Sequence, residues 1–289
     1  MQTLILVAIA GLAAQLVDGS LGMGYGLTSS TLLIFAGLTP AAASASVHLA
    51  EVGTTALSGI AHHRFGNVDW HAVRRIALPG GIGAFLGATL LSSLSTESAK
   101  PLASTLLFTL GIYVLLRSLL GKARIQRKGT PGLRLLAPLG LIGGFIDATG
   151  GGGWGPVTTP TLLADGRLAP NRVIGTVSAS EFIVALSASA GFFTALGGEI
   201  VRVEYVAALL AGGLIAAPIA AYLVRHLNPR LLGVIVGGFI CFTNARVLLS
   251  AAGVSGDLFL AAYVVLIAVW SASIAAVVIA LKREPAAAR

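Results

Sequence analysis

Charged residues are scarce in this sequence. Of its 289 residues, 10% are Asp, Glu, Lys or Arg, 56% are hydrophobic, and the mean hydropathy is +0.90. A water-soluble domain carries roughly 25% charged residues, so the composition excludes one. It predicts a polytopic membrane protein, with the lipid bilayer as its first partner.

Cysteine and the common catalytic motifs are also missing. The single cysteine, Cys241, excludes an internal disulfide. No Walker or Rossmann glycine motif, Gly-x-Ser-x-Gly elbow or paired-histidine zinc motif fits the sequence. We therefore predict no enzyme, no cofactor and no resident metal. The net charge of +8 comes from basic residues in short loops between apolar runs, which argues against nucleic-acid binding.

What the sequence does contain is a series of apolar segments, in two groups. A membrane-spanning helix needs about 20 apolar residues. In the first group the last three segments meet this length and the first two fall short. The second group repeats this pattern in its first five segments, and one further long segment follows. Each half is therefore predicted to begin with a short helix hairpin that re-enters or crosses the membrane. The segments are approximately 3–17, 20–38, 41–61, 72–94 and 99–120, then 135–147, 154–164, 172–197, 204–224, 229–250 and 258–281.

The two groups form a repeat. We predict an all-α membrane protein with a first repeat over 1–120, a basic linker over 121–134, a second repeat over 135–250, and an extra helix and tail over 251–289. The basic linker indicates a cytoplasmic side, which places the N-terminus outside and the C-terminus inside. Each half then reverses the sidedness of the chain. The two repeats are therefore expected to be inverted, as in alternating-access carriers.

A glycine-rich motif breaks the apolar segments at matching places, over 18–26 and over 147–156. Duplicated breaks point to a transporter's binding site, because free backbone amides at a half-helix N-terminus suit an anion. The alternative is close helix packing, and Tyr25 and Trp154 could be cavity walls or interfacial aromatics. The predicted substrate-binding residues are Ser20, Gly22, Gly24, Tyr25, Ser46, Thr149, Gly150, Gly151, Gly152, Gly153, Trp154 and Thr176.

Acidic residues also occur inside the apolar segments. Glu51 and Glu181 lie at equivalent repeat positions, where an ionised carboxylate costs about 2.5–3.5 kcal/mol and so needs a partner or a proton. The alternatives are a hydrogen-bonded seam between helices and, for the two aspartates beside the glycines, helix capping. The predicted proton-coupling or cavity residues are Asp18, His48, Glu51, Asp147, Ser178 and Glu181, with Ser44, Thr55 and Ser58 on the same helix face as His48 and Glu51.

The stretch from Gly144 to Leu163, GFIDATGGGGWGPVTTPTLL, followed by IGTVSASEF over 174–182, resembles the TauE/SafE family of sulfite and organosulfonate exporters. The resemblance implies a bacterial inner-membrane permease for small sulfur oxyanions or other anions, with pseudo-symmetric helical halves. The first glycine motif departs from the family pattern at Leu21 and Met23.

These features together predict a secondary active carrier for a small anion, sulfite or an organosulfonate, that works by alternating access with proton coupling. The alternative is a cation or metal-ion permease whose ligands would be Asp18, His48, Glu51, Asp147 and Glu181. A channel and a non-transporting scaffold are further rivals. The sequence leaves the oligomeric state open, and a homo-oligomer is allowed.

Overall fold

The computed structural model describes residues 2–21, 24–120, 129–197, 203–223 and 228–283. Within these ranges the chain forms eleven α-helices and no strand. Six of the described helices, α4, α5, α6, α8, α10 and α11, are long and apolar enough to cross a membrane. The helices are α1 (Gln2–Leu21), α2 (Tyr25–Phe35), α3 (Pro40–Arg64), α4 (Trp70–Ser93), α5 (Thr96–Leu120), α6 (Leu133–Gly150), α7 (Trp154–Asp165), α8 (Pro170–Leu196), α9 (Val203–Leu223), α10 (Pro229–Ala251) and α11 (Gly256–Arg283).

The hairpin that opens each half is less symmetric than predicted. α2 has 11 residues and α7 has 12, which are short as expected. α1 has 20 residues and α6 has 18, and α6 is among the helices long enough to span. The prediction of two short helices was wrong for α6, because this helix continues past Asp147 and ends only at Gly150. Each hairpin therefore pairs a long helix with a short one.

Glycine conformation explains where α6 stops. Gly151 has a φ of 75° and Gly152 a φ of 151°, in a region that residues with a Cβ rarely adopt. Gly24, with a φ of 120°, immediately precedes α2, as its repeat counterpart Gly153 immediately precedes α7. The duplicated breaks thus need glycine for backbone reasons.

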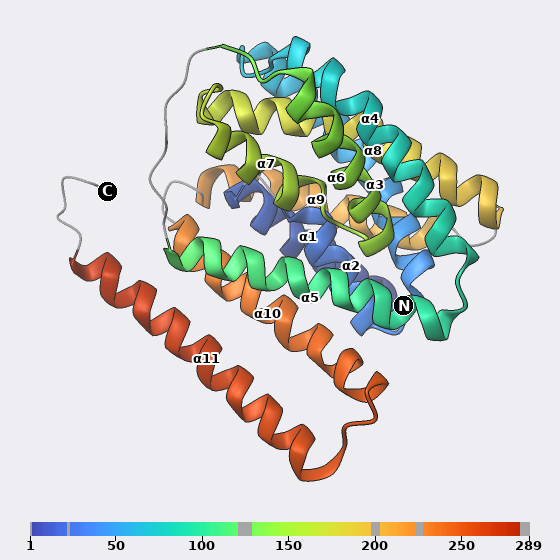
Figure 1. Cartoon of the computed structure of the whole chain (residues 1–289), viewed down its shortest axis with the longest axis vertical. Coiled ribbons are helices and arrows are strands. Elements are labelled where there is room, and N and C mark those ends of the chain that lie inside the picture. Colours follow the sequence, from blue (N-terminus) through green and yellow to red (C-terminus); the bar gives the residue numbers. More distant parts are fainter. Residues whose placement is uncertain (1, 22–23, 121–128, 198–202, 224–227, 284–289) are drawn as a thin grey trace.

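The two sequence halves are interleaved rather than packed side by side. α4 of the first half packs against α6 and α8 of the second, and α9 of the second packs against α1 and α3 of the first (Figure 1). In addition, α3 contacts α8, and α5 lies along α10. The contacts follow the repeat. When each helix is replaced by its equivalent in the other half, α4–α6 becomes α9–α1 and α4–α8 becomes α9–α3, while α3–α8 and α5–α10 stay the same.

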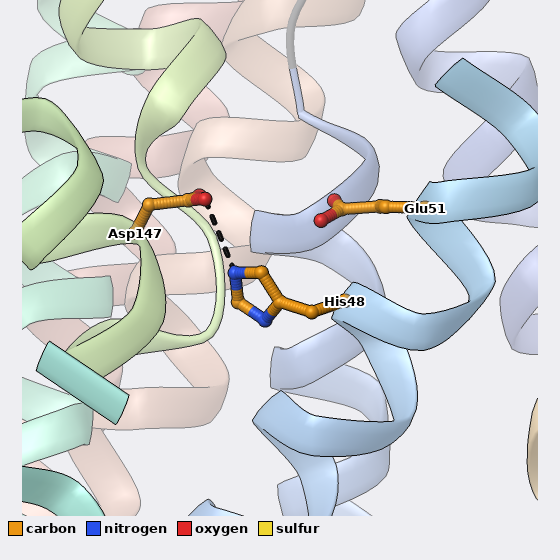
Figure 2. Close-up of side chains that lie close together, drawn as sticks. All are labelled: His48, Glu51 and Asp147. Atoms are coloured by element: carbon orange, nitrogen blue, oxygen red, sulfur yellow. Dashed lines mark hydrogen bonds and ion pairs between the residues drawn. The ribbon is translucent and has the colours of Figure 1, made fainter. Parts of the chain in front are cut away.

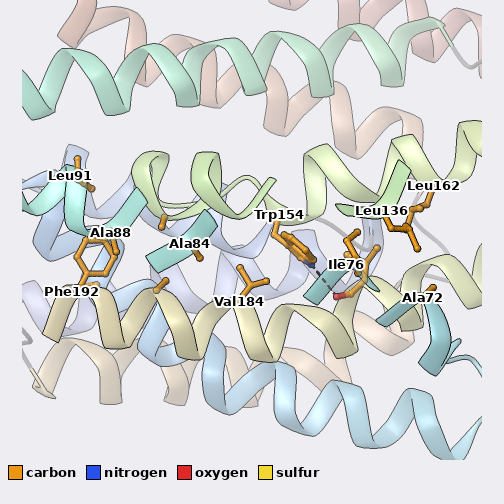
Figure 3. Close-up of a cluster of buried hydrophobic side chains, with 14 of the residues drawn as sticks. Ala72, Ile76, Ala84, Ala88, Leu91, Leu136, Trp154, Leu162, Val184 and Phe192 are labelled. Atoms are coloured by element: carbon orange, nitrogen blue, oxygen red, sulfur yellow. Dashed lines mark hydrogen bonds between the residues drawn. The ribbon is translucent and has the colours of Figure 1, made fainter. Parts of the chain in front are cut away.

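The buried apolar side chains follow this interleaving. One cluster joins α1, α2, α3 and α9, which we call the first bundle, and includes Val7, Leu33 and Leu209. A second cluster joins α4, α6, α7 and α8, the second bundle, with small contributions from α3 and α5. In Figure 3, Trp154 lies in the middle of the second cluster, between Ile76 and Val184. Each bundle therefore contains three helices of one half and the fourth helix of the other.

Glycines allow α4 and α6 to pack closely. A Cβ on Gly144 would collide with the carbonyl group of Gly80, and one on Gly83 would collide with the carbonyl oxygen of Leu141. Such small-residue contacts are a common way for membrane helices to associate. The glycines of α4 and α6 are thus explained by packing.

α11 lies at the edge of the molecule and contacts α10 and, less extensively, α5 (Figure 1). Its most apolar 18-residue window is only 11% buried. In a membrane protein, lipid covers such a surface.

Candidate functional site

The two glycine breaks meet at the interface between the bundles. A Cβ on Gly26 would lie 2.9 Å from the Cα of Gly152, and a Cβ on Gly152 would collide with the amide nitrogen of Leu27. Ser30 of α2 donates a hydrogen bond to the carbonyl oxygen of Gly151. The breaks therefore touch through their backbones, in close contact that no larger residue would permit.

The side chain of Asp147 binds the backbone amides that were predicted from the sequence to bind an anion. Its Oδ1 accepts hydrogen bonds from the backbone N–H groups of Gly153, at 2.7 Å, and Trp154, at 2.9 Å. The N–H of Gly152 donates to the Asp147 carbonyl oxygen at 2.9 Å. The side chain thus caps α7 from within the same hairpin. In this structure these amides already have a partner.

The second carboxylate oxygen of Asp147 pairs with His48. His48 Nε2 lies 3.1 Å from Asp147 Oδ2, and the side chains are 0% and 2% exposed. On the other side of the ring, Nδ1 lies 2.8 Å from the carbonyl oxygen of Ser44. The hydroxyl of Ser44 donates to the carbonyl oxygen of Ala148 at 2.8 Å. Figure 2 shows the His48 ring directed from α3 toward the carboxylate on α6.

Glu51 extends the pair by one helical turn. Its carboxylate points toward His48 and Asp147 in Figure 2, and one oxygen or nitrogen of each residue lies within 4.8 Å of the others. The residue is 2% exposed. Its Oε2 has no hydrogen-bond partner. A buried, unpartnered carboxylate oxygen is costly unless it is protonated or binds something.

A small cavity lies on the other side of Glu51. Its volume is about 30 Å³, the space of about one water molecule. Three acids line it, Asp18, Glu51 and Glu181, from α1, α3 and α8. The remaining lining side chains are polar: Gln15, Tyr25, Thr54, Thr55, Ser58 and Ser178. The cavity lies where α8 of the second bundle faces the first, and Ser178 donates a hydrogen bond to Ser58 across this interface at 2.7 Å.

Five of the predicted site residues therefore line one cavity: Asp18, Tyr25, Glu51, Ser178 and Glu181. Two lining residues, Gln15 and Thr54, were not among the residues predicted from the sequence. Each lies three residues from a predicted acid, Gln15 before Asp18 and Thr54 after Glu51, and so shares its helix face. A search for polar residues at that spacing would have found both.

Other predicted residues lie elsewhere. Trp154 is 0% exposed, and its Nε1 donates to the Val177 carbonyl oxygen at 3.2 Å, inside the apolar core of the second bundle. Thr176 accepts the amide N–H of Asp69 at 3.0 Å. Ser46 donates to the Ala42 carbonyl oxygen of its own helix at 2.7 Å. None of these three side chains lines the cavity.

The remaining predicted residues belong to the breaks. Thr149 and Gly150 to Gly153 are buried, and Gly24 is half-buried ahead of α2. The Thr149 hydroxyl has no hydrogen-bond partner. Gly22 lies outside the described residues, and so does the side chain of Ser20.

Comparison with known proteins gives one family. The profile described as "Sulfite exporter TauE/SafE" matches residues 7–247. "Probable membrane transporter protein YtnM" of Bacillus subtilis (strain 168) is 56% identical over 252 residues, which cover 86% of this chain and 84% of that protein. No solved structure matches the chain.

Proposed function

The chain belongs to the sulfite exporter TauE/SafE family of membrane transporters, and we propose that it carries a small anion, sulfite or an organosulfonate, together with protons. The observation that carries this proposal is the polar cavity at the interface between the two bundles. It is lined by buried and half-buried residues of four helices and includes both membrane glutamates.

Hydrogen-bond donors for an oxyanion surround this cavity. Gln15 offers an amide N–H₂, and Tyr25 and Ser58 offer hydroxyl groups, while the hydroxyls of Thr54 and Ser178 donate to the Glu51 carbonyl oxygen and to Ser58. The Tyr25 hydroxyl is buried without a hydrogen-bond partner. Neutral donors of this kind bind an oxyanion without the cost of burying a fixed positive charge. In this proposal the anion binds to side chains of the cavity rather than to the amides that Asp147 occupies.

The three acids are the reason to propose proton coupling. An anion entering a cavity lined by Asp18, Glu51 and Glu181 would be repelled by ionised carboxylates at close range. Protonation removes the repulsion and turns each carboxylic acid into a further donor. Anion and proton binding would then favour one another, which is a reciprocal coupling.

Alternating access is proposed to move the bundles rather than the sequence halves. Because α4 packs in the second bundle and α9 in the first, the halves 1–120 and 135–250 are not separate bodies. A rocking of one bundle against the other would open the cavity toward each side of the membrane in turn. A cavity of about 30 Å³ is too small for sulfite, so binding requires such a movement.

The orientation remains as the basic residues indicate. We propose a multi-pass protein of the bacterial inner membrane, with inverted repeats, the N-terminus outside and the C-terminus in the cytoplasm.

Ligand-induced thermal stabilisation of the purified protein tests the substrate class. The ligands are sulfite, methanesulfonate, sulfate, Mg²⁺ and Mn²⁺. A ligand at 100 times its dissociation constant adds about 2.7 kcal/mol, and we expect sulfite or methanesulfonate to do so. Tyr25→Phe should weaken the effect, whereas Tyr113→Phe, on the exposed part of α5, should not. Stabilisation by the cations alone would overturn the anion proposal in favour of a cation permease.

A further inference from the structure

We propose that His48 and Asp147 form a second proton-binding site beside the cavity, which passes its proton to and from Glu51 and controls separation of the two bundles. This inference rests on the proposed proton-coupled transport and adds the groups that hold the proton at the interface. It is carried by three observations: the hydrogen bonds of the His48 ring, the position of the pair, and the unpartnered oxygen of Glu51.

The hydrogen bonds fix the number of protons on the pair. His48 Nδ1 faces the Ser44 carbonyl oxygen, which can only accept. The Ser44 hydroxyl also lies 3.3 Å from Nδ1, but its hydrogen is directed to the Ala148 carbonyl oxygen. Nδ1 must therefore carry a proton. One further proton then joins Nε2 to Asp147 Oδ2, and it lies on the imidazole of His48 or on the carboxyl group of Asp147.

Both partners are held in place by their neighbours. Asp147 Oδ1 is fixed by two amides of the α7 N-terminus, which leaves only Oδ2 for His48. The His48 ring packs against Phe192 of α8, with ring centroids 6.1 Å apart. The pair is thus pre-oriented for proton transfer along one direction.

Glu51 provides the next proton acceptor. It is one helical turn from His48 on α3, and its free Oε2 is buried. The titratable groups that face it come from every helix around the cavity. These are Asp147 on α6, Asp18 on α1, Glu181 on α8 and Tyr25 on α2. When the proton passes to Glu51, the N–H bond at His48 Nε2 breaks and an O–H bond forms at Glu51 Oε2, which places the proton between the cavity acids and the His48–Asp147 pair.

The position of the pair couples this proton to movement. His48 belongs to the first bundle and Asp147 to the second. Separating them as ions would leave two unpaired buried charges, which is strongly unfavourable. If the proton moves from Nε2 to Oδ2, one N–H bond breaks, one O–H bond forms, and both groups become neutral. The bundles can then separate at far smaller cost.

A proton fits this place better than a metal ion. The cavity reaches Glu51, but neither His48 nor Asp147 lines it. Both side chains are at most 2% exposed and already in contact with one another. A metal ion would need room between them, whereas a proton needs none.

The first test observes the protonation of His48 directly and needs no substrate. The ¹⁵N NMR signals of the histidine ring are followed as a function of pH in the detergent-purified full chain, and His48→Gln identifies the His48 signals. We expect Nδ1 to remain protonated throughout. The Nε2 signal should shift with pH in wild type, and the pH at the midpoint of this shift should be different in Glu51→Gln. A ring with an unprotonated Nδ1, or a signal insensitive to both pH and Glu51→Gln, overturns the proposal.

The second test separates proton movement from anion movement. In proteoliposomes, sulfite exchange across the membrane is compared with net sulfite uptake driven by a pH gradient. In His48→Gln and Asp147→Asn, the ratio of net uptake to exchange should fall by about tenfold or more, because a pair that cannot exchange a proton no longer couples the pH gradient to the return of the empty carrier. Asp69→Asn is the matched control, since Asp69 caps α4 through the amides of His71 and Ala72 as Asp147 caps α7. Its ratio should stay at the wild-type value.

The outcomes of the two tests keep the proposals apart. If wild type moves no sulfite or sulfonate at all, the proposed function fails, while the NMR titration still decides whether His48 and Asp147 share a proton. If transport is present and the ratio is unchanged in both variants, the proton site is refuted and the anion carrier stands. If the ratio of net uptake to exchange also falls in Asp69→Asn, the effect comes from the loss of a helix cap in general, and the proton site is refuted. Stabilisation of wild type by Zn²⁺ that is lost in His48→Gln would replace the proton by a metal ion.

Discussion

Gly26 and Gly152, which belong to opposite halves of the chain, lie in direct backbone contact. A Cβ on Gly26 would come within 2.9 Å of the Cα of Gly152. This contact joins the two helix breaks at the interface where the bundles meet. Beside it, Asp147 caps α7 and pairs with His48, and Glu51 connects that pair with the cavity.

The contact makes a prediction about Gly152. Gly152→Ala should destabilise the fold, because the new Cβ meets the Leu27 amide and the φ of 151° is unfavourable. Gly253→Ala is the control, with a φ of 71° and open space around it. A left-handed alanine costs about 1–2 kcal/mol, and overpacking adds about 1–3 kcal/mol. Thermal melting in detergent should therefore show a clearly lower Tm for Gly152→Ala. Equal melting temperatures would contradict the backbone contact.

The two aromatic residues of the repeat should behave differently. Trp154→Phe removes the hydrogen bond to the Val177 carbonyl oxygen in the core, which keeps its bond from the Ser180 hydroxyl, at a cost of about 0.5–1.5 kcal/mol; the smaller ring also leaves a cavity. We expect a lower Tm and an unchanged sulfite affinity. Tyr25→Phe removes only a hydroxyl that lacks a partner and should retain the Tm while weakening sulfite binding. Melting curves with and without sulfite measure both effects. The reverse pattern would place the site at Trp154.

Close packing of α4 on α6 makes a third prediction. Gly144→Ala would force its Cβ against the carbonyl of Gly80, whereas a Cβ on Gly59 would lie 3.5 Å from the nearest atom, an ordinary contact. Gly144→Ala should therefore lower stability by about 1–3 kcal/mol, and Gly59→Ala should change it little. Both are compared by thermal melting. A tolerated Gly144→Ala would mean that the two helices are further apart.

The repeat predicted much of this arrangement, and its limits have physical causes. The acids, the glycine breaks and the number of helices were readable because polar and glycine residues are conspicuous in an apolar chain. The interleaving of the halves was not, since hydropathy says nothing about which helix pairs with which. For the same reason Trp154 was assigned to the substrate although it packs in the core, while Tyr25 at the equivalent position lines the cavity. The role of Asp147 was left open between capping and coupling, and its two oxygens face both an amide pair and His48.

Site-directed labelling tests the inverted topology. After Cys241→Ala, single cysteines are introduced at four exposed helix ends, and whole cells are treated with a membrane-impermeant thiol reagent. Ser95→Cys and Asp257→Cys should be labelled from outside, because the basic residues place them opposite the linker. Arg134→Cys and Lys282→Cys should react only after the cells are opened. Labelling of Arg134→Cys in intact cells would reverse or break the proposed orientation.

Uptake of methanesulfonate into proteoliposomes tests proton-coupled anion transport, since the charge of this anion does not depend on pH. Uptake is measured with and without an imposed pH gradient in wild type, in Glu181→Gln and in the control Glu97→Gln, whose side chain is exposed at the start of α5. We expect the gradient to drive accumulation in wild type and in Glu97→Gln. Glu181→Gln should lose this dependence, because the cavity then lacks an acid that must take up a proton. Accumulation by wild type that is the same with and without the gradient would contradict proton coupling.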